Sequence, residues 1–135
     1  MKLYTHLNFG GNCEEAFRFY EKHLGGKIGM VLRQDQIKAQ IGANAGAGSA
    51  VIHARLSIAD VELIANDVRP DRFQPIRSSY LYLALDSPGE AQDVYQKLSE
   101  GGTVAMPLAE TFFAPRFAQL RDKFGVLWTI ICQKV

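Results

Sequence analysis

Cysteine is nearly absent from this sequence, which excludes the small disulfide-linked domains. The chain has 135 residues and two cysteines, Cys13 and Cys132, too few for a disulfide framework. A catalytic thiol needs a nearby base, whereas Cys13 is followed by the acidic residues Glu14 and Glu15. We therefore expect both cysteines to be small buried residues in a reducing compartment. A reactive Cys13 is the alternative, because the start of a helix can activate a thiol.

Net charge and long apolar runs are also missing. The formal net charge is +1, which provides no long-range field to attract nucleic acid or an anionic membrane. The longest apolar runs, Leu81–Leu85 and Val126–Ile131, are far shorter than the ~20 residues that span a bilayer. Met1 leads directly into a strand-like segment, without the basic and apolar regions of a signal peptide. We expect a cytoplasmic protein that has neither a nucleic-acid nor a membrane partner.

What the sequence does contain is one order of elements that occurs twice. A strand is followed by a helix that ends at Gly-Gly, and then by three further strands. The strands are expected at residues 2–9, 27–33, 50–58 and 61–67, and again at 79–86, 103–108, 115–122 and 126–133. Asn12 is the expected N-cap of the first helix, and Ser87-Pro88 starts the second. The sequence predicts an α+β fold of two βαβββ units, residues 1–68 and 79–135, joined by a linker at 69–78.

Each half is too small to bury a satisfactory core alone. Two halves placed edge to edge would form a curled mixed sheet, with the helices outside and a cup on the inner face. Alternation along the strands then predicts which side chains point away from the helices and line the cup. These residues are His6 and Asn8, His53 with Arg55 and Ser57, and Tyr80 with Tyr82. A polar lining on an apolar scaffold is typical of a small-molecule site.

Three residues near the connection between the strands expected at 103–108 and 115–122 are further candidates for the site. Glu110 could act as a general base if Phe112 and Phe113 exclude water from it. It could instead pair with Arg116 or cap the loop, which is the interpretation we favour. Arg116 could bind an anionic ligand, and Phe113 would add an aromatic wall. Arg116 and Arg121 are an odd number of residues apart, so only one of them can line the cup.

A glycine-rich segment, GANAGAG at residues 42–48, superficially suggests a phosphate-binding loop. Such a loop ends a strand and opens a helix, but this one leads into the strand at 50–58. We interpret it as a hairpin connection, either a lid or a dimer arm. Nor do we find a strand, glycine-rich turn and helix, followed by an acidic strand end, that could hold the nucleoside of a methyl donor. Trp128 alternates with Val126 and Ile130 and is expected in the core.

Two segments resemble the PhnB-like branch of the vicinal-oxygen-chelate superfamily, which includes glyoxalases, bleomycin-resistance proteins and dioxygenases. They are HLNFGGNCEEAFRFYEKHLGG (residues 6–26) and LAETFFAPRFAQLRDKFGVLWTI (residues 108–130). VIHARLSI and YLYLALDS are similar to the middle strands of that family. The resemblance implies a glyoxalase-like fold and a homodimer. It also attaches the label "3-demethylubiquinone-9 3-methyltransferase-like", although we expect no methyl transfer.

The resemblance further implies where metal ligands would lie if the protein used a metal. The superfamily's ligand positions fall on His6, Tyr80, Thr129, and Ile64 or Asn66. Of these only His6 is a convincing ligand, and catalytic metal sites commonly need three. We therefore expect no metal or other cofactor. A divalent metal held by His6 in a rearranged set with His53, Asp67 or Glu110 is the alternative.

Three functions remain open from the sequence. The first is binding of a small molecule, aromatic or anionic, without a metal. The second is a metal-dependent lyase, isomerase or dioxygenase with a rearranged ligand set. The third is a non-enzymatic dimer that acts by association with another protein. The residues do not decide whether a bond is made or broken.

Overall fold

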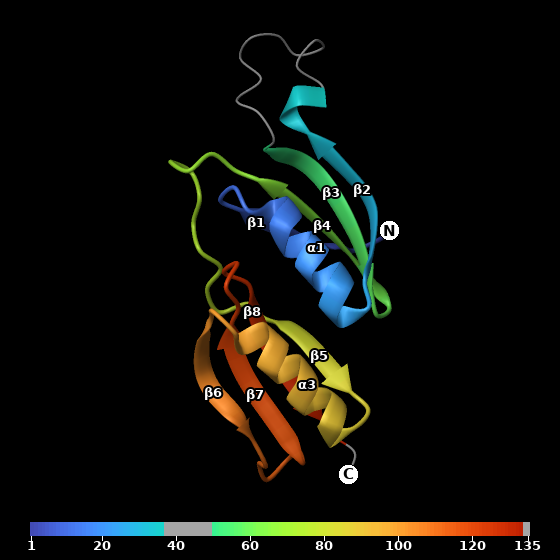
Figure 1. Ribbon diagram of the computed structural model, residues 1–135, viewed down its shortest axis with the longest axis vertical. Helices are drawn as coiled ribbons and strands as arrows, with labels where there is room; N and C mark the ends of the chain where they lie inside the picture. The colour runs from blue at the N-terminus through green and yellow to red at the C-terminus, as the bar shows by residue number, and fades with distance from the viewer. Residues whose placement is uncertain (37–49, 134–135) are drawn as a thin grey trace. The chain divides into compact units, whose positions relative to one another are not determined.

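The computed structural model describes residues 1–36 and 50–133 (Figure 1). These residues form two compact units, Met1–Gln74 and Pro75–Val135. Each unit has one four-stranded sheet and a helix of 12 residues, and in Figure 1 each helix lies across one face of its own sheet. The predicted α+β fold of two βαβββ units is confirmed. The glycine-rich segment 42–48 lies outside the described residues.

Besides the helical residues 34–36, the described part of the first unit has a longer helix and four strands. They are β1 Thr5–Phe9, α1 Cys13–Leu24, β2 Lys27–Arg33, β3 Val51–Ile58 and β4 Val61–Asp67. The strand order is β1-β4-β3-β2. β1 runs parallel to β4, and β3 is antiparallel to both of its neighbours.

The second unit repeats this arrangement. Its elements are β5 Leu81–Leu85, α3 Pro88–Ser99, β6 Thr103–Ala109, β7 Arg116–Arg121 and β8 Leu127–Cys132. The order β5-β8-β7-β6 places equivalent strands in equivalent positions. The prediction that both sheets enclose one cup concerns the placement of the units relative to each other, and it stays a prediction.

Alternation along the strands divides each sheet into two faces. In the first unit the buried side chains of the strands lie on the side of α1, where the Phe9 and Phe17 ring centroids are 6.2 Å apart. In this layer α1 contributes Ala16, Phe17 and Tyr20, all fully buried. The strands contribute Leu7, Phe9, Ala54, Leu56, Leu63 and Ala65. We call the opposite face of a sheet, away from its own helix, its far face.

The first strand is shorter than predicted. The sequence pattern started it at Lys2 and placed Leu3 under the helix, whereas β1 begins at Thr5 and Leu3 is 97% exposed. β1 pairs with β4, and the first residue pair is Thr5 with Leu63. Residues 2–4 therefore run beside the turn where β4 begins, and the ladder does not extend to them.

The start of α1 is stabilised differently from the prediction. Asn12 occupies the N-cap position, as predicted, but its side chain makes no capping hydrogen bond. The Asp67 carboxylate accepts hydrogen bonds instead, from the backbone N–H groups of Gly11 and Cys13 at 3.0 Å each and of Val51 at 2.9 Å. Asp67 can do so because it pairs with Phe9 at the end of β1, directly before this turn. A residue distant in sequence thus replaces the local cap.

The second unit has a local cap and a buried carboxylate elsewhere. The Ser87 hydroxyl accepts a hydrogen bond from the Glu90 N–H at 3.1 Å, as expected of a Ser-Pro helix start. Asp122 is 3% exposed and accepts hydrogen bonds from the N–H groups of Phe124 and Val126. Its other oxygen accepts from the indole Nε1 of Trp128 at 2.9 Å. Trp128 is 2% exposed, which confirms its predicted place in the core.

Candidate functional site

The far face of the first sheet carries a group of polar side chains from three strands. Pairing of His6 with Ile64, Asn8 with Asn66, and Arg55 with Ile64 puts these residues on one side of the sheet. The predicted alternation therefore holds: His6, Asn8 and His53 share a face. We call this group the first far face and define it by Tyr4, His6, Asn8, His53, Arg55, Glu62 and Asn66.

Arg55 is the centre of a hydrogen-bonded network on this face. Its Nη1 donates to Glu62 Oε1 at 2.8 Å, and its Nε donates to His53 Nε2 at 3.3 Å. The guanidinium carbon lies 5.8 Å from the centre of the Tyr4 ring. The hydrogen bond to Glu62 raises the pKa of Arg55 above its ordinary value. Three contacts thus fix the guanidinium, which otherwise would sample many rotamers.

The hydrogen bonds also fix the tautomers of both imidazoles. The Asn66 amide nitrogen donates to the Asp67 carbonyl at 3.2 Å, so the Asn66 Oδ1 is the atom that faces His6 Nε2. An amide oxygen only accepts, so His6 Nε2 donates this bond. Arg55 only donates, so His53 Nε2 accepts from it. His53 therefore carries its proton on Nδ1, and neutral His6 has its lone pair on Nδ1.

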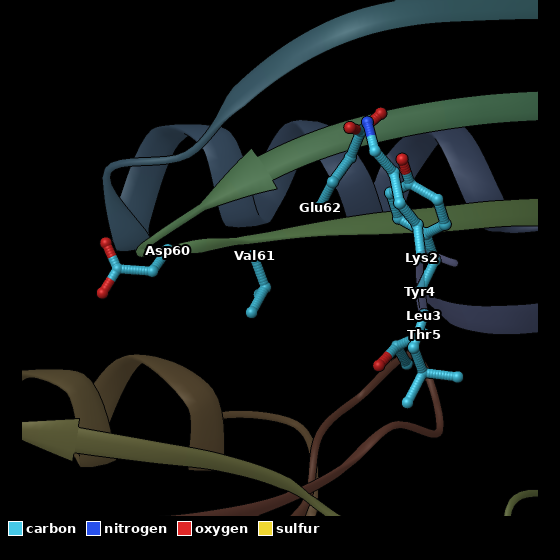
Figure 2. Close-up of a pocket in the computed structure, with 7 residues that line it drawn as sticks. All are labelled: Lys2, Leu3, Tyr4, Thr5, Asp60, Val61 and Glu62. Carbon is cyan, nitrogen blue, oxygen red and sulfur yellow. The ribbon is translucent and has the colours of Figure 1, made fainter.

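A hollow of about 370 Å³ lies at one end of this face (Figure 2). It extends between the N-terminal segment and the start of β4. Its lining consists of Lys2, Leu3, Tyr4, Thr5, Asp60, Val61 and Glu62. Figure 2 shows the Lys2, Tyr4 and Glu62 side chains gathered on one side, with Asp60 apart from them at the β3–β4 turn. Tyr4 and Glu62 also contact Arg55, so the hollow continues the network.

The far face of the second sheet is less polar. Tyr82 and Gln119 both pair with Thr129, and the Gln119 side-chain nitrogen donates to the Thr129 hydroxyl at 3.1 Å. Tyr82 is 63% exposed. Tyr80 precedes β5 and lines a separate hollow of about 360 Å³ together with Arg121.

The strand register decides which of the two arginines lies on the far face of the second sheet. Arg116 pairs with Cys132, and its position in β7 alternates with Ala118 and Leu120, which are fully buried. Arg121 is the arginine on the far face, where its two terminal nitrogens donate to the carbonyls of Gly125 and Ile76 at 2.8 Å. The odd spacing allowed only one of the two, and the register selected Arg121.

Glu110 forms neither the ion pair nor the loop cap that the sequence suggested. It is exposed, and it forms no ion pair or hydrogen bond with the part of the chain that the structure describes. The favoured pairing with Arg116 is therefore absent. Phe112 is fully exposed and Phe113 is 49% exposed, so neither ring removes water from the carboxylate. Glu110, Phe113 and Arg116 instead line one hollow beside the start of α3.

Both cysteines are fully buried, as predicted. Burial, together with the neighbouring carboxylates of Asp67 and Glu14, raises the pKa of the Cys13 thiol to about 12. The start of α1 does not activate this thiol, because Asp67 places a negative charge there. Cys13 is a core residue, as the favoured interpretation of the sequence predicted.

The side chains at the superfamily's ligand positions do not fit a metal ion. Counted back from the pairs Phe9–Asp67 and Leu85–Cys132, the residue equivalent to His6 is Tyr82. The ligand position that the resemblance put on Tyr80 therefore falls two residues later, on Tyr82. Tyr82 pairs with Thr129, the ligand position on β8. His6 Nε2 is engaged with Asn66. Within residues 1–36 and 50–133 no three His, Cys, Asp or Glu side chains converge as a metal site would require.

One glycine turn lies between a strand and a helix of the first unit. It is Gly10-Gly11, between β1 and α1. A β-carbon on Gly10 would lie 3.1 Å from the Phe73 ring, and Gly11 has φ +120°, so the turn requires both glycines. Two of its N–H groups, on Gly11 and Cys13, already donate to Asp67. The turn therefore does not offer these N–H groups to the phosphate or nucleoside of a cofactor.

Comparison with known proteins places the chain in a family. The family model described as 3-demethylubiquinone-9 3-methyltransferase matches residues 1–131. The chain belongs to this family. The chain is similar to Protein YjdN of Escherichia coli K12, with 29% identity over 141 residues, covering 96% of this chain and 94% of that protein.

Crystal structures support the same assignment. Protein PA1353 from Pseudomonas aeruginosa has 34% identity over 100% of this chain and 99% of its own, with a TM-score of 0.87. The PhnB protein from Bacillus cereus has 28% identity over 98% and 99%, with a TM-score of 0.85. A glyoxylase/bleomycin resistance protein/dioxygenase domain from Frankia, 13% identical over 98% and 97%, has a TM-score of 0.64 and shares the fold. The PhnB-like resemblance and the glyoxalase-like fold are confirmed.

Sequence reasoning missed the importance of Arg55, Glu62 and Tyr4. The alternation did place Arg55 beside His53 and Tyr4 beside His6. Their connection depends on Glu62, which reaches Arg55 from the neighbouring strand β4. A cross-strand pair of opposite charges near a tight turn is the signal that would have found it.

Proposed function

We propose that this protein binds a small polar molecule on the first far face, without the metal ion of the wider superfamily. The observation that supports this most directly is the fixed position of Arg55 between Glu62, His53 and Tyr4. Preorganised polar groups lose little entropy when a ligand binds. The hollow of about 370 Å³ beside them has the size of a small-molecule site.

The hydrogen-bonding groups left over indicate which ligand chemistry fits. Arg55 uses its Nε and Nη1 within the protein and retains N–H groups on its terminal nitrogens. His53 retains a donor at Nδ1, and Lys2 adds an ammonium to the lining of the hollow. These groups favour a ligand that carries a carboxylate or another strong acceptor. The Tyr4 ring would contact an aromatic part of it.

A metal-dependent lyase, isomerase or dioxygenase is the less favoured function. It would need His6 to release Asn66 or to bind through Nδ1, and it would need ligands other than Ile64, Tyr82 and Thr129. Methyl transfer is not proposed either, despite the family description. The turn that leads into α1 is occupied by Asp67, and α3 is preceded by Ser87-Pro88 instead of a glycine turn.

Nuclear magnetic resonance of the histidine side chains tests binding at this face. All three histidines lie in the first unit, and His23 on α1 stacks on Phe19 with 4.4 Å between ring centroids. We expect metal-free protein titrated with benzoate to show shifts of the His53 and His6 signals, with the His23 signal unchanged. Arg55→Met should abolish these shifts. Arg18→Met, on the exposed surface of α1, should preserve them.

Two results would count against this function. Benzoate, acetate and inorganic phosphate that all leave His53 unmoved would show that the face does not bind acceptor ligands. Stoichiometric Zn, Ni, Fe or Mn in purified protein, together with loss of the His6–Asn66 bond, would support the metal-dependent alternative. At 100 times its dissociation constant, a true ligand should stabilise the fold by about 2.7 kcal/mol.

The predicted homodimer belongs to this proposal as well. Light scattering after size-exclusion chromatography measures the mass of the protein in solution, and we expect the mass of a dimer. The third function considered, association with another protein, would gain support if the first far face binds no small molecule and the dimer is stable.

A further inference from the structure

A second hollow, in the second unit, belongs to a different set of residues. It has a volume of about 420 Å³ and lies between the start of α3 and the loop that connects β6 to β7. Its lining comprises Pro88, Glu110, Thr111, Phe112, Phe113, Ala114, Pro115 and Arg116. None of these residues lies on the first far face, so a ligand here would be distinct from the proposed one.

The loop that forms this hollow is held by its own hydrogen bonds. The Thr111 N–H donates to the Ala114 carbonyl at 2.9 Å, and the Ala114 N–H donates to the Thr111 hydroxyl at 3.1 Å. The turn between them presents Phe112 and Phe113, whose ring centroids are 5.1 Å apart. Phe113 is supported from behind by Phe117 at 4.9 Å. The two rings thus stand on a defined turn.

Both rings are exposed to solvent, as in a surface that binds a ligand. Phe112 is 101% exposed and Phe113 is 49% exposed. Phe112 therefore contributes nothing to the core of the unit, and adjacent exposed aromatic side chains are typical of binding surfaces. The two rings alone do not define the chemistry of the ligand. The charged side chains beside them do.

Glu110 and Arg116 line the same hollow with opposite charges and do not pair with each other. In the described part of the chain neither forms an ion pair with any other residue. Arg116 Nη1 donates to the adjacent Pro115 carbonyl at 2.7 Å, which leaves the other N–H groups of the guanidinium available. Two opposite charges that share a hollow without contact leave a space that a molecule with both charges can bridge.

We propose that this hollow binds a zwitterion with an apolar side chain, of the α-amino acid class. The ligand carboxylate would accept hydrogen bonds from Arg116, where a guanidinium and a carboxylate form strong charge-assisted bonds. Its ammonium would donate to Glu110, and its side chain would pack on Phe112 and Phe113. The volume of the hollow falls within the range of small-molecule sites.

Calorimetric titration with L-phenylalanine and two single-charge analogues tests this proposal. 3-Phenylpropionate lacks the ammonium, and 2-phenylethylamine lacks the carboxylate. We expect L-phenylalanine to bind at least about tenfold more tightly than either analogue, because each lacks one charge-assisted contact. The titrations use Arg55→Met protein, whose first far face is expected not to bind carboxylates. All three histidine signals of the first unit should then stay in place, which separates this site from the first far face.

Charge-neutral variants should remove the two contacts one at a time. Glu110→Gln is expected to weaken the binding of L-phenylalanine about tenfold and to leave the affinity for 3-phenylpropionate unchanged. Arg116→Gln should weaken the binding of L-phenylalanine and of 3-phenylpropionate, and it should leave the affinity for 2-phenylethylamine unchanged. The matched control is Glu100→Gln, an exposed carboxylate after α3 in the same unit, which should change nothing. Trp128 fluorescence confirms that each variant is folded.

Three outcomes would overturn the proposal. They are equal affinity for all three compounds, no heat of binding with Arg55→Met protein at millimolar concentration, and an unchanged affinity for L-phenylalanine in Glu110→Gln. A movement of the His53 signal by L-phenylalanine would reassign its binding to the first far face. The failure of this proposal would leave the benzoate experiment unaffected, since the two sites share no residue.

Discussion

The first and second units place equivalent strands in the same order, yet their far faces carry different chemistry. The first far face has two imidazoles, a fixed guanidinium and a carboxylate linked by hydrogen bonds. On the equivalent face of the second unit Gln119 donates to Thr129, and Arg121 donates to backbone carbonyls. Tyr82 is exposed on this face. Where His6 stands in β1, the second unit has Tyr82.

The sides that face the helices differ much less. Leu56 in β3 and Leu120 in β7 occupy equivalent strands, and both are fully buried. A helix packed on a sheet requires apolar side chains at alternate strand positions in either unit. The far face has no such requirement. The comparison indicates that the fold constrains one side of each sheet and leaves the other side free to carry function.

The largest expected effect tests whether the two cores are equivalent. Leu56→Ala and Leu120→Ala should each lower the free energy of unfolding by about 4 kcal/mol, because each removes a fully buried side chain and leaves a cavity. Tyr82→Ala, at an exposed position of a far face, should cost about 1 kcal/mol or less. Urea unfolding followed by circular dichroism measures all three. A much smaller cost in one unit would show that its core is not equivalent.

The next effect compares the two carboxylates that each accept three hydrogen bonds. Asp122→Ala should lower the free energy of unfolding by about 3 kcal/mol, because it leaves the buried N–H donors of Phe124, Val126 and Trp128 without an acceptor. Asp67→Ala should cost about 2 kcal/mol, because Asp67 is only half-buried and water can reach its donors. The change in Trp128 fluorescence during urea unfolding reports the second unit. Equal costs would contradict the difference in burial.

The smallest effect concerns an ion pair between the helix and the sheet of the first unit. The Arg33 guanidinium on β2 donates to Glu14 on α1 at 2.8 Å. This hydrogen bond, together with Arg18, holds the pKa of Glu14 below its ordinary value of 4.5. A carboxyl whose pKa is lowered in the folded state stabilises the fold above pH 4.5, and this contribution is lost as the pH falls through the folded-state pKa.

Glu14→Gln should therefore lower Tm by about 1–5 °C at pH 7. The difference from wild type should shrink in acid, because wild-type Glu14 then becomes neutral as well. Thermal unfolding at pH 7 and pH 3 measures it. The control is Glu15→Gln in the same helical turn, where Glu15 makes no ion pair with the described residues. A Tm difference that grows in acid would reverse the assigned sign.

Much of the fold could be predicted because its signals are local. β2 and β4 have the predicted bounds, and α1 ends at Gly25 in a left-handed conformation with φ 71°, as its Gly-Gly pair indicated. The shared face of His6, Asn8 and His53 followed from alternation alone. Features that depend on contacts between residues distant in sequence could not be predicted, such as the carboxylate that holds the start of α1. The favoured pairing of Glu110 with Arg116 was wrong.

By itself the sequence determined the two βαβββ units, their order, and the division of each strand into a side toward the helix and a side away from it. These follow from periodicity and turn residues, which act over a few positions of the chain. The tertiary structure alone decided that Asp67 holds the start of α1, that Glu62 fixes Arg55, and that Arg121 lies on the far face instead of Arg116. Each of these depends on the register between strands distant in sequence, and a shift of one residue would reverse it.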